Sequence, residues 1–256
     1  MLLTIDIGNT QTAVGLLDGE EVTAHWRLTT IAEQTEDELR ISLRGLFGLE
    51  GYRLHDISGV ALSSVVPALT AAYRRVGHGI TDGPVVVVGP GVKTGMQILI
   101  DNPREVGADR IANSVAARER YETPAVVVDF GTSTNFDVVG ANGVYLGGVI
   151  SPGLHIATNA LISGTAALRR VEYNPPRSPI GKGTVEAIQS GALYGHAGLV
   201  DGIMERVAAE LGGDVTRVAT GGLASTIVPH CSSVSTIDEF LTLEGLRKIY
   251  ELNTDD

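Results

Sequence analysis

The sequence is almost free of cysteine, and Cys231 is the only one. A single cysteine forms no internal disulfide, and it cannot build a metal site that needs several thiolates. Such a residue most often serves as a small buried apolar side chain or an idle surface thiol. The shortage of cysteine therefore fits a protein of a reducing compartment.

Basic residues are also scarce, with 19 Lys and Arg against 30 Asp and Glu and a formal net charge of −11. A chain this acidic is a poor partner for nucleic acid or for an anionic membrane. No apolar run approaches the ~18 residues of a membrane span. The N-terminus lacks the basic segment of a signal peptide, and Asp6 interrupts its apolar stretch. We therefore expect a soluble, cytoplasmic protein that binds neither nucleic acid nor membranes.

Several common catalytic motifs are missing as well. The sequence contains no G-x-G-x-x-G after its first strand, no H-E-x-x-H and no G-x-S-x-G. Gly181-Lys182 does not belong to a Walker A loop, because Pro176 replaces the first glycine of that motif and Gly183 replaces its Ser or Thr. A phosphate site in this chain therefore has to be built in another way.

Glycine, in contrast, is abundant, with 32 residues that gather near the ends of predicted strands. The first seventeen residues, MLLTIDIGNTQTAVGLL, show the pattern: an apolar strand over 2–7 carries Asp6 near its end, and Gly8 opens a small polar turn. A second apolar strand follows, and Asp18-Gly19 predicts a tight hairpin turn. An ordinary β-hairpin is the alternative interpretation of this stretch.

The same arrangement occurs a second time in the sequence. Residues 125–134, AVVVDFGTST, repeat the apolar strand, the aspartate, the glycine and the hydroxyl run, and Asn142-Gly143 predicts a second hairpin turn. Asp6 and Asp129 are separated by nearly half of the 256-residue chain. The repeat predicts two duplicated α/β domains at 1–118 and 119–256, with a last helix that can pack back on the first domain.

Hydrophobic periodicity predicts the elements of both halves. The predicted strands cover 2–7, 21–28, 59–66, 85–88, 125–130, 134–139, 144–150, 215–219 and 234–237. The predicted helices cover 34–47, a segment opening at Pro67, a segment from Ile111, 154–168, 185–211 and 241–252, with Thr35 and Glu38 as a capping box. Glycines 191, 195, 198 and 202 predict close approach of another helix.

Residues 107–110 form a further candidate site between the two repeats. Gly107-Ala108-Asp109-Arg110 places a carboxylate beside a guanidinium near a predicted helix start. A salt bridge or cap on a surface helix is the alternative. Turns of small residues at strand ends suit a phosphate ligand. Two such turns, each with an aspartate able to hold a cation, predict an ATP-dependent phosphotransferase.

Six motifs in this order resemble those of one enzyme family. They are D-x-G-N-T at 6–10, D-N-P-R-E-V-G-A-D-R at 101–110, D-F-G-T-S-T at 129–134, G-G-x-I-x-P-G at 147–153, G-K-x-T at 181–184 and A-T-G-G at 219–222. The combination covers nearly the whole chain and resembles the type III pantothenate kinases. Each motif alone is weak, whereas the six in order are specific.

The resemblance implies a fold of the acetate- and sugar-kinase/actin-like superfamily. This fold has two duplicated actin-like (ribonuclease H-like) α/β domains, each a mixed central sheet flanked by helices, with ATP in the interdomain cleft. The implied reaction transfers the γ-phosphate of ATP to pantothenate and forms 4'-phosphopantothenate in the first step of coenzyme A biosynthesis. It implies Mg²⁺, a monovalent cation, K⁺ or NH₄⁺, and a homodimer whose interface completes the substrate site.

The resemblance also implies a role for individual residues. Asp109 is the general base, Asp129 binds the monovalent cation, and Asp6 lies near Mg²⁺. The residues implied in ATP binding are Asp6, Ile7, Gly8, Asn9, Thr10, Gln11, Thr12, Ala13 and Thr132. Those implied in substrate binding are Ile100, Gly107, Ala108, Asp109, Arg110 and Thr184, with Arg110 a candidate partner for the pantothenate carboxylate.

Three places depart from common forms of the family. Ile100 stands where many members carry tyrosine, Gly183 replaces a frequent asparagine, and Ser133-Thr134-Asn135 is a variant of the usual hydroxyl run. A non-catalytic accessory or regulatory relative is the alternative from another class, and the intact Asp6, Asp109 and Asp129 argue against it. A phosphatase or another small-molecule kinase of the superfamily is a second alternative, because fold does not fix substrate.

Overall fold

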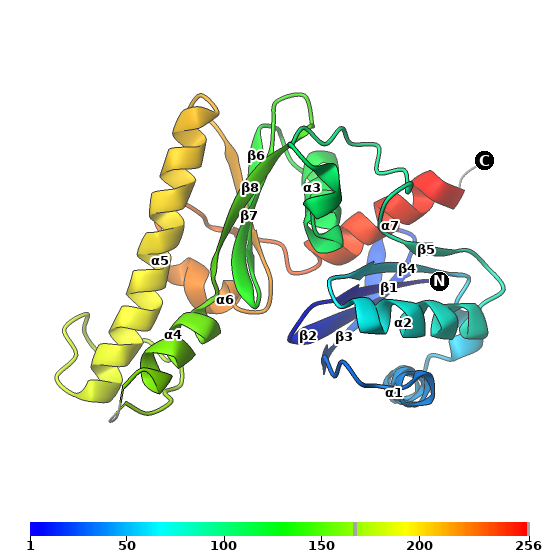
Figure 1. The fold of residues 1–256 in the computed structure, drawn as a ribbon, viewed down its shortest axis with the longest axis horizontal. Helices are drawn as coiled ribbons and strands as arrows, with labels where there is room; N and C mark the ends of the chain where they lie inside the picture. Colours follow the sequence, from blue (N-terminus) through cyan, green and yellow to red (C-terminus); the bar gives the residue numbers. More distant parts are fainter. Residues whose placement is uncertain (166–167, 255–256) are drawn as a thin grey trace. The chain divides into compact units, whose positions relative to one another are not determined.

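The chain folds into two compact units, seen in a computed structural model that describes residues 1–165 and 168–254 (Figure 1). The first unit contains residues 1–119 and the chain from Phe240 onward, and the second contains Arg120–Glu239. The sequence-based division gave 119–256 to the second domain, with a last helix able to pack on the first. In the structure this helix, α7 (Leu241–Thr254), packs on the sheet of the first unit.

The first unit is built on a five-stranded mixed sheet in the order β3-β2-β1-β4-β5. The central strand β1 pairs antiparallel with β2 and parallel with β4. The strands are β1 (Leu2–Ile7), β2 (Gln11–Asp18), β3 (Glu21–Thr29), β4 (Gly59–Ser64) and β5 (Val85–Val87). The helices are α1 (Glu36–Leu49), α2 (Pro67–Ile80) and α3 (Ala108–Arg120), with short 3-10 turns at Leu54–Asp56 and Pro103–Glu105.

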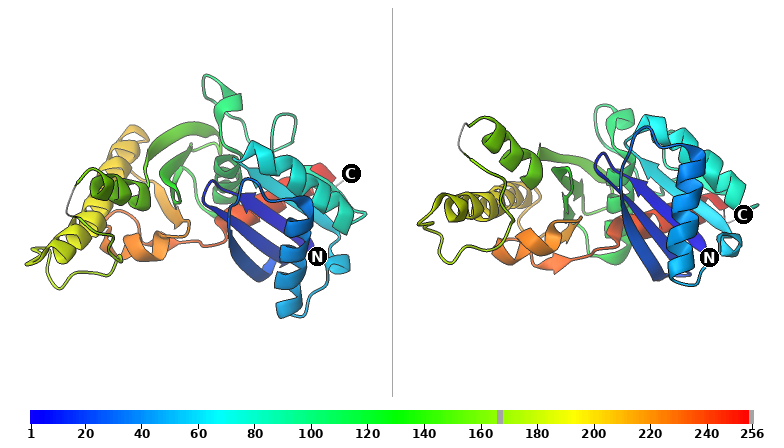
Figure 2. Two further views of the ribbon diagram at one scale, coloured as in Figure 1. Left: turned by 60° about the horizontal axis from the view of Figure 1, so that its bottom comes forward. Right: turned by 90° about the horizontal axis from the view of Figure 1, so that it is seen from below.

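Side chains of β1 alternate between the two faces of this sheet, as they do in any strand. Leu3, Ile5 and Ile7 are buried in a core with α1 and α2. On the other face, Leu243 of α7 and the hydroxyl of Thr4 both lie close to Gly15. Figure 2 shows α1 and α2, in blue and cyan, on one side of the sheet and α7, in red, on the other. Asp6 shares the face of Thr4.

The second unit repeats this plan with a five-stranded sheet in the order β10-β9-β6-β7-β8. The central strand β6 pairs antiparallel with β7 and parallel with β9. The strands are β6 (Ala125–Phe130), β7 (Ser133–Val139), β8 (Tyr145–Pro152), β9 (Thr216–Thr220) and β10 (Thr236–Ile237). The helices are α4 (Leu154–Ser163), α5 (Thr184–Glu210) and α6 (Ala224–Ile227), followed by a 3-10 turn at Val228–His230. The duplicated α/β architecture expected from the sequence is confirmed.

The core of the second unit lies between its sheet and α5. Val126, Val128 and Phe130 of β6 pack in one cluster with Leu193 and Val200 of α5. Asp129 therefore points to the opposite face of the sheet. No helix within 1–165 or 168–254 has the length and apolarity that a membrane span requires.

Two details of the helices are decided by the structure. The predicted capping box is confirmed, since Thr35 and Glu38 exchange hydrogen bonds at the start of α1. The helix predicted over 154–168 ends earlier, at Ser163 with Gly164 as its cap, and its predicted positions 166–167 lie outside the described residues. Glycine lowers helix stability, so a helix ends readily where Gly164 follows its last turn.

Candidate active site

The first predicted phosphate segment forms a tight turn between β1 and β2. The N–H of Gly8 donates to the carbonyl of Gln11 at 3.0 Å, and the hydroxyl of Thr30 donates to the carbonyl of Gly8 at 2.8 Å. The N–H of Thr30 donates to the carbonyl of Thr10 at 3.0 Å. The end of β3 therefore fixes the shape of this turn. Sequence reasoning missed Thr30, which nothing in the local sequence marks.

The side chains of this segment are not equally accessible. Asn9, Thr10 and Gln11 are exposed, whereas Ile7 and Thr12 are buried. The Thr12 hydroxyl lies 2.9 Å from that of Thr30. Any contact of Ile7 or Thr12 with a nucleotide therefore has to use backbone atoms, and the exposed residues offer both backbone and side-chain groups. Ala13 is half-buried and adds no polar side chain.

Asp6 is oriented by the neighbouring parallel strand. The register of β1 and β4 places Asp6 beside Ser63, whose fully buried hydroxyl donates to Asp6 Oδ1 at 2.6 Å. Because both strands end at the same edge of the sheet, a serine at the end of β4 reaches the carboxylate directly. Sequence reasoning missed Ser63, although the pair Ser63-Ser64 at the end of an apolar strand was a usable signal.

Asp109 lies in the first turn of α3 and is partly buried. Its Oδ1 accepts a hydrogen bond from the N–H of Arg110 at 2.9 Å. Burial raises the pKa of the Asp109 carboxyl, and this effect exceeds the opposite effects of the Arg110 N–H and the Arg110 charge. A Cβ at position 107 would lie 2.4 Å from Asp109 Oδ1, so glycine there leaves room for the carboxylate. Ala108 is buried.

Ile100 precedes the turn that leads to α3. It is half-buried and lies in the segment between β5 and the 3-10 turn at Pro103–Glu105, in the same unit as Asp109. Within this unit the structure therefore contains the implied substrate residues Ile100 and 107–110 together with the first phosphate turn.

Asp129 occupies the position in β6 that Asp6 occupies in β1. The strand register places it opposite Asn135 of β7 on one side and opposite Thr220 of β9 on the other. Gly221 follows Thr220 with φ +92°, and a Cβ there would lie 2.4 Å from Asp129 Oδ1. The carboxylate is therefore packed against the backbone of this second turn. Thr132 lies in the turn between β6 and β7 and is half-buried.

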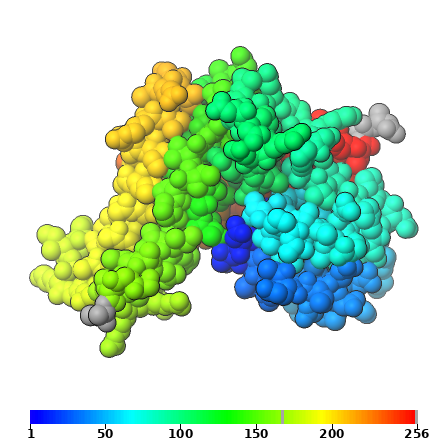
Figure 3. Space-filling view, viewed as in Figure 1, coloured from blue at the N-terminus to red at the C-terminus, as the bar shows by residue number. Residues whose placement is uncertain are grey.

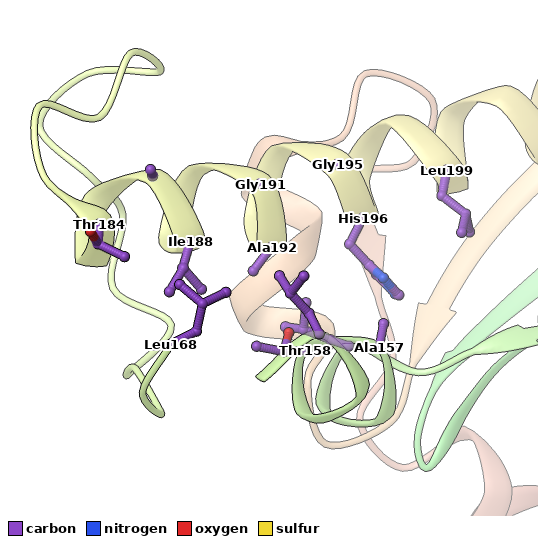
Figure 4. Close-up of a pocket in the computed structure, with 13 residues that line it drawn as sticks. Ala157, Thr158, Leu168, Thr184, Ile188, Gly191, Ala192, Gly195, His196 and Leu199 are labelled. Atoms are coloured by element: carbon purple, nitrogen blue, oxygen red, sulfur yellow. The ribbon is translucent and has the colours of Figure 1, made fainter. Parts of the chain in front are cut away.

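Thr184 is the first residue of α5 and is exposed. It lies at one end of a largely apolar cavity of about 470 Å³ between α4 and α5, and His196 lines the same cavity (Figure 4). Nε2 of His196 is 2.8 Å from the hydroxyl of Thr134 in β7. Burial lowers the pKa of His196. Thr184 is roughly 18 Å from His196 along the helix, at 1.5 Å per residue. Thr184 thus lies at the opposite end of the cavity from the His196–Thr134 contact.

Metal binding here has to rely on single carboxylates with polar neighbours. The described ranges contain no group of three or more His, Cys, Asp or Glu side chains that could hold a metal ion. Asp6 with Ser63, and Asp129 with Asn135 and Thr220, offer oxygen atoms, which are the ligands that Mg²⁺ and alkali cations accept. Their chemistry fits hard cations.

Comparison with known proteins identifies the family. The family model described as type III pantothenate kinase matches residues 2–206. The chain belongs to the type III pantothenate kinase family. The type III pantothenate kinase of Frankia alni is 53% identical over 254 residues, a match that covers 99% of this chain and 100% of that protein. The family resemblance seen in the sequence motifs is thereby confirmed, and the chain is a kinase by membership.

Solved structures show the same fold at low sequence identity. A protein of Campylobacter jejuni described as a conserved putative Baf family transcriptional activator matches with a TM-score of 0.62 and 19% identity, over 99% of this chain and 100% of that one. A putative N-acetylglucosamine kinase of Porphyromonas gingivalis matches with a TM-score of 0.54 and 13% identity, over 100% of each chain. At these identities the likeness shows the fold alone.

Proposed function

We propose that this kinase transfers the γ-phosphoryl group of ATP to the primary hydroxyl of pantothenate and forms 4'-phosphopantothenate, the first step of coenzyme A biosynthesis. Family membership along most of the chain supports this substrate. The structural observation that carries the proposal is Asp109, a partly buried carboxylate with a raised pKa at the start of α3. It has the chemistry of a general base.

The proposed base takes the proton of the pantothenate hydroxyl as the new bond to phosphorus forms. A carboxylate with a raised pKa accepts a proton more readily than an ordinary aspartate does. Its hydrogen bond from the Arg110 N–H holds the side chain in one orientation. Ile100 and residues 107–110 bind pantothenate in this proposal, with the Arg110 guanidinium directed to the pantothenate carboxylate.

Both phosphate turns bind ATP in this proposal. Residues 6–13 offer the exposed residues Asn9, Thr10 and Gln11, and Thr132 belongs to the second turn. Phosphoryl transfer has a loose transition state, so positioning of the phosphates and stabilisation of their charge provide most of the catalysis. The hydrogen bonds that shape the first turn, from Gly8 and Thr30, support a fixed phosphate position.

Two cations complete the proposed site, Mg²⁺ near Asp6 and K⁺ or NH₄⁺ at Asp129. When bound, they supply the positive charge that offsets the phosphate oxygens in a chain of net charge −11. The contribution of the protein is orientation: Ser63 holds Asp6, and the Gly221 backbone packs against Asp129.

We further propose a homodimer in which Thr184 serves the substrate site of the partner. The exposure of Thr184 at the first residue of α5, about twelve residues before the His196–Thr134 contact, supports this, because the side chain is open to a second copy of the chain. Leu161, which lines the cavity between α4 and α5, is 50% exposed, and Val185 near the start of α5 is 55% exposed. Figure 3 shows α4 and the start of α5, in green and yellow-green, at the surface.

Glycines along α5 support the same proposal. The sequence predicts close approach of a helix at glycines 191, 195 and 198, yet a Cβ at these positions would meet no atom within 4 Å. The expected approach is therefore wrong for the single chain. Open backbone beside exposed apolar side chains suits a second copy of this chain, since buried apolar area stabilises association.

The proposed function is tested with purified full-length protein, ATP, Mg²⁺ and K⁺. We expect ADP release that depends on added pantothenate, together with a product one phosphate heavier than pantothenate by mass spectrometry. Asp109→Asn is expected to bind ATP and to lose turnover. Absence of pantothenate-dependent ADP release over a broad range of ATP concentrations would contradict the kinase assignment and favour an accessory role.

A further inference from the structure

The side-chain oxygen of Asn135 is buried without a donor. Within the described residues, Oδ1 of Asn135 is shielded from solvent and accepts no hydrogen bond. Buried polar atoms in folded proteins are almost always satisfied, by protein groups, water or an ion. An acceptor oxygen of this kind is therefore expected to face a ligand that supplies positive charge or a proton.

The strand register places this oxygen next to Asp129. Asn135 is directly opposite Asp129 in the antiparallel β6–β7 pair, so the two side chains share one face of the sheet. Directly opposite residues have Cβ atoms ~4.5–5.5 Å apart. Thr220 is the partner of Asp129 in β9 and shares this face as well. An amide oxygen, a carboxylate and a hydroxyl therefore form one row across three strands.

The duplication of the chain shows which member of this row is additional. Thr220 is the counterpart of Ser63, because each is the parallel-strand partner of the aspartate in its own unit. Asn135 is the counterpart of Ala13, the antiparallel-strand partner of Asp6. The first unit thus has no side-chain oxygen at this position. The second unit has one more side-chain oxygen beside its aspartate that could bind a cation.

We propose that Asn135 is a ligand of the monovalent cation held at Asp129 and sets its preference for single charge. This inference rests on the proposed function, from which the cation comes. One carboxylate with neutral amide and hydroxyl oxygens carries a formal charge of about −1, and ligand charge is a main determinant of cation preference. Such a set suits K⁺ or NH₄⁺ better than a divalent ion.

The experiment measures cation binding rather than activity. The full-length protein with Mg²⁺ and a non-hydrolysable ATP analogue is unfolded thermally in increasing KCl, with N-methylglucamine chloride keeping ionic strength constant. Three variants are compared with the natural sequence. Asn135→Leu removes the oxygen at similar volume, Asn135→Asp keeps an oxygen and adds charge, and Asn174→Leu makes the same change at an exposed loop position.

We expect K⁺ to raise the Tm of the natural protein and of Asn174→Leu. The K⁺ concentration that gives half of the Tm increase should be the same for both. Asn135→Leu should need about tenfold more K⁺ or lose the shift, as for other groups around a metal. Asn135→Asp should retain a cation-dependent shift and move the preference toward Mn²⁺ or Ca²⁺ over K⁺. The aspartate variant keeps the test valid if the leucine variant does not fold.

An unchanged K⁺ half-saturation in folded Asn135→Leu would overturn the inference, and so would absence of any K⁺ shift in the natural protein. The pantothenate-dependent ADP assay on the natural protein separates this result from the proposed function. Turnover with an unchanged cation response of Asn135→Leu rejects only the role of Asn135. Absence of turnover rejects the kinase reaction, whatever the cation response.

Discussion

The hydroxyl of Ser63 donates a 2.6 Å hydrogen bond to Oδ1 of Asp6, across two parallel strands that end at the same edge of the first sheet. Ser63 is fully buried, so this bond is shielded from water and fixes the carboxylate from behind. A carboxylate that is fixed before a ligand arrives costs less to order on binding. The duplicated unit places the hydroxyl-bearing Thr220 at the equivalent position beside Asp129.

Removal of this hydroxyl should weaken both ATP use and the fold. We expect Ser63→Ala to lower kcat/KM for MgATP by about tenfold, as for groups that orient metal-binding carboxylates. Its free energy of unfolding should fall by about 1.5–3 kcal/mol, the range for a hydrogen bond to a charged group. Steady-state kinetics and urea unfolding measure the two effects.

Ser58→Ala is the matched control. Ser58 lies just before β4 and is exposed, and its hydroxyl donates a hydrogen bond to the carbonyl of Met1. It should leave kcat/KM unchanged. Equal kinetic losses in the two variants would show that Ser63 acts only through stability.

Gly107 should control the position of Asp109, the proposed catalytic carboxylate. A Cβ at residue 107 would lie 2.4 Å from Asp109 Oδ1, so Gly107→Ala has to move that side chain. We expect kcat to fall by about 10²-fold, because small misplacements of reacting groups have effects of that size. The Tm should change little, since the displaced atom ends a flexible side chain. Gly45→Ala is the control, because no atom lies near its Cβ position.

The raised pKa of Asp109 predicts an unusual acidic limb of the pH–rate profile. The proposed base acts as a carboxylate, and burial raises the pKa of Asp109 above the ordinary 3.8. Activity should therefore be lost on acidification at a higher pH than for a solvent-exposed aspartate. A profile of kcat/KM for pantothenate against pH measures this limb. A limb at or below pH 3.8, with the protein still folded, would contradict the assignment.

The raised pKa of Asp109 also makes the stability of the fold depend on pH. The native state binds the Asp109 proton more tightly than the unfolded chain, so this residue favours folding below pH 3.8 and that contribution is lost as pH rises through the native pKa. At neutral pH the buried charge opposes folding. Asp109→Asn should therefore be inactive and at least as stable as the natural protein at pH 7, and a clearly lower Tm would argue against this balance.

Hydrophobic periodicity predicted most strands and helices because it reports which side of an element is buried. The predicted bounds of β1 and β6 agree with the structure, and those of α1 agree to within two residues. The residue types at positions 35 and 38 predicted the capping box of α1 as well. Helix ends depend on weaker local preferences, and α4 ended before its predicted limit for that reason.

The candidate site was predictable only where its residues are close in the sequence. Asp6 with Gly8 and Asp109 with Arg110 are local pairs. Ser63 is far from Asp6 along the chain, and Thr30 reaches the Gly8 turn from the end of another strand. Such contacts are set by strand register, which a single sequence states only indirectly. The glycines of α5 were predicted to contact another helix, and the single chain places no atom near Gly191, Gly195 or Gly198. A glycine shows only that another element has room to approach, and the sequence does not show whether one does.

The surface between α4 and α5 allows a direct test of the proposed dimer. Leu161 lines the cavity there and is 50% exposed, so Leu161→Asp should change the stability of the single chain little. A charge in an apolar interface costs desolvation, and the dimer should dissociate. We expect monomers by light scattering and a KM for pantothenate raised by about tenfold or more, because Thr184 would no longer reach a partner site. Ile41→Asp makes the same change on α1, where Ile41 is 71% exposed, and should stay dimeric. A monomeric natural protein, or a dimeric Leu161→Asp with normal KM, would contradict the role of this surface.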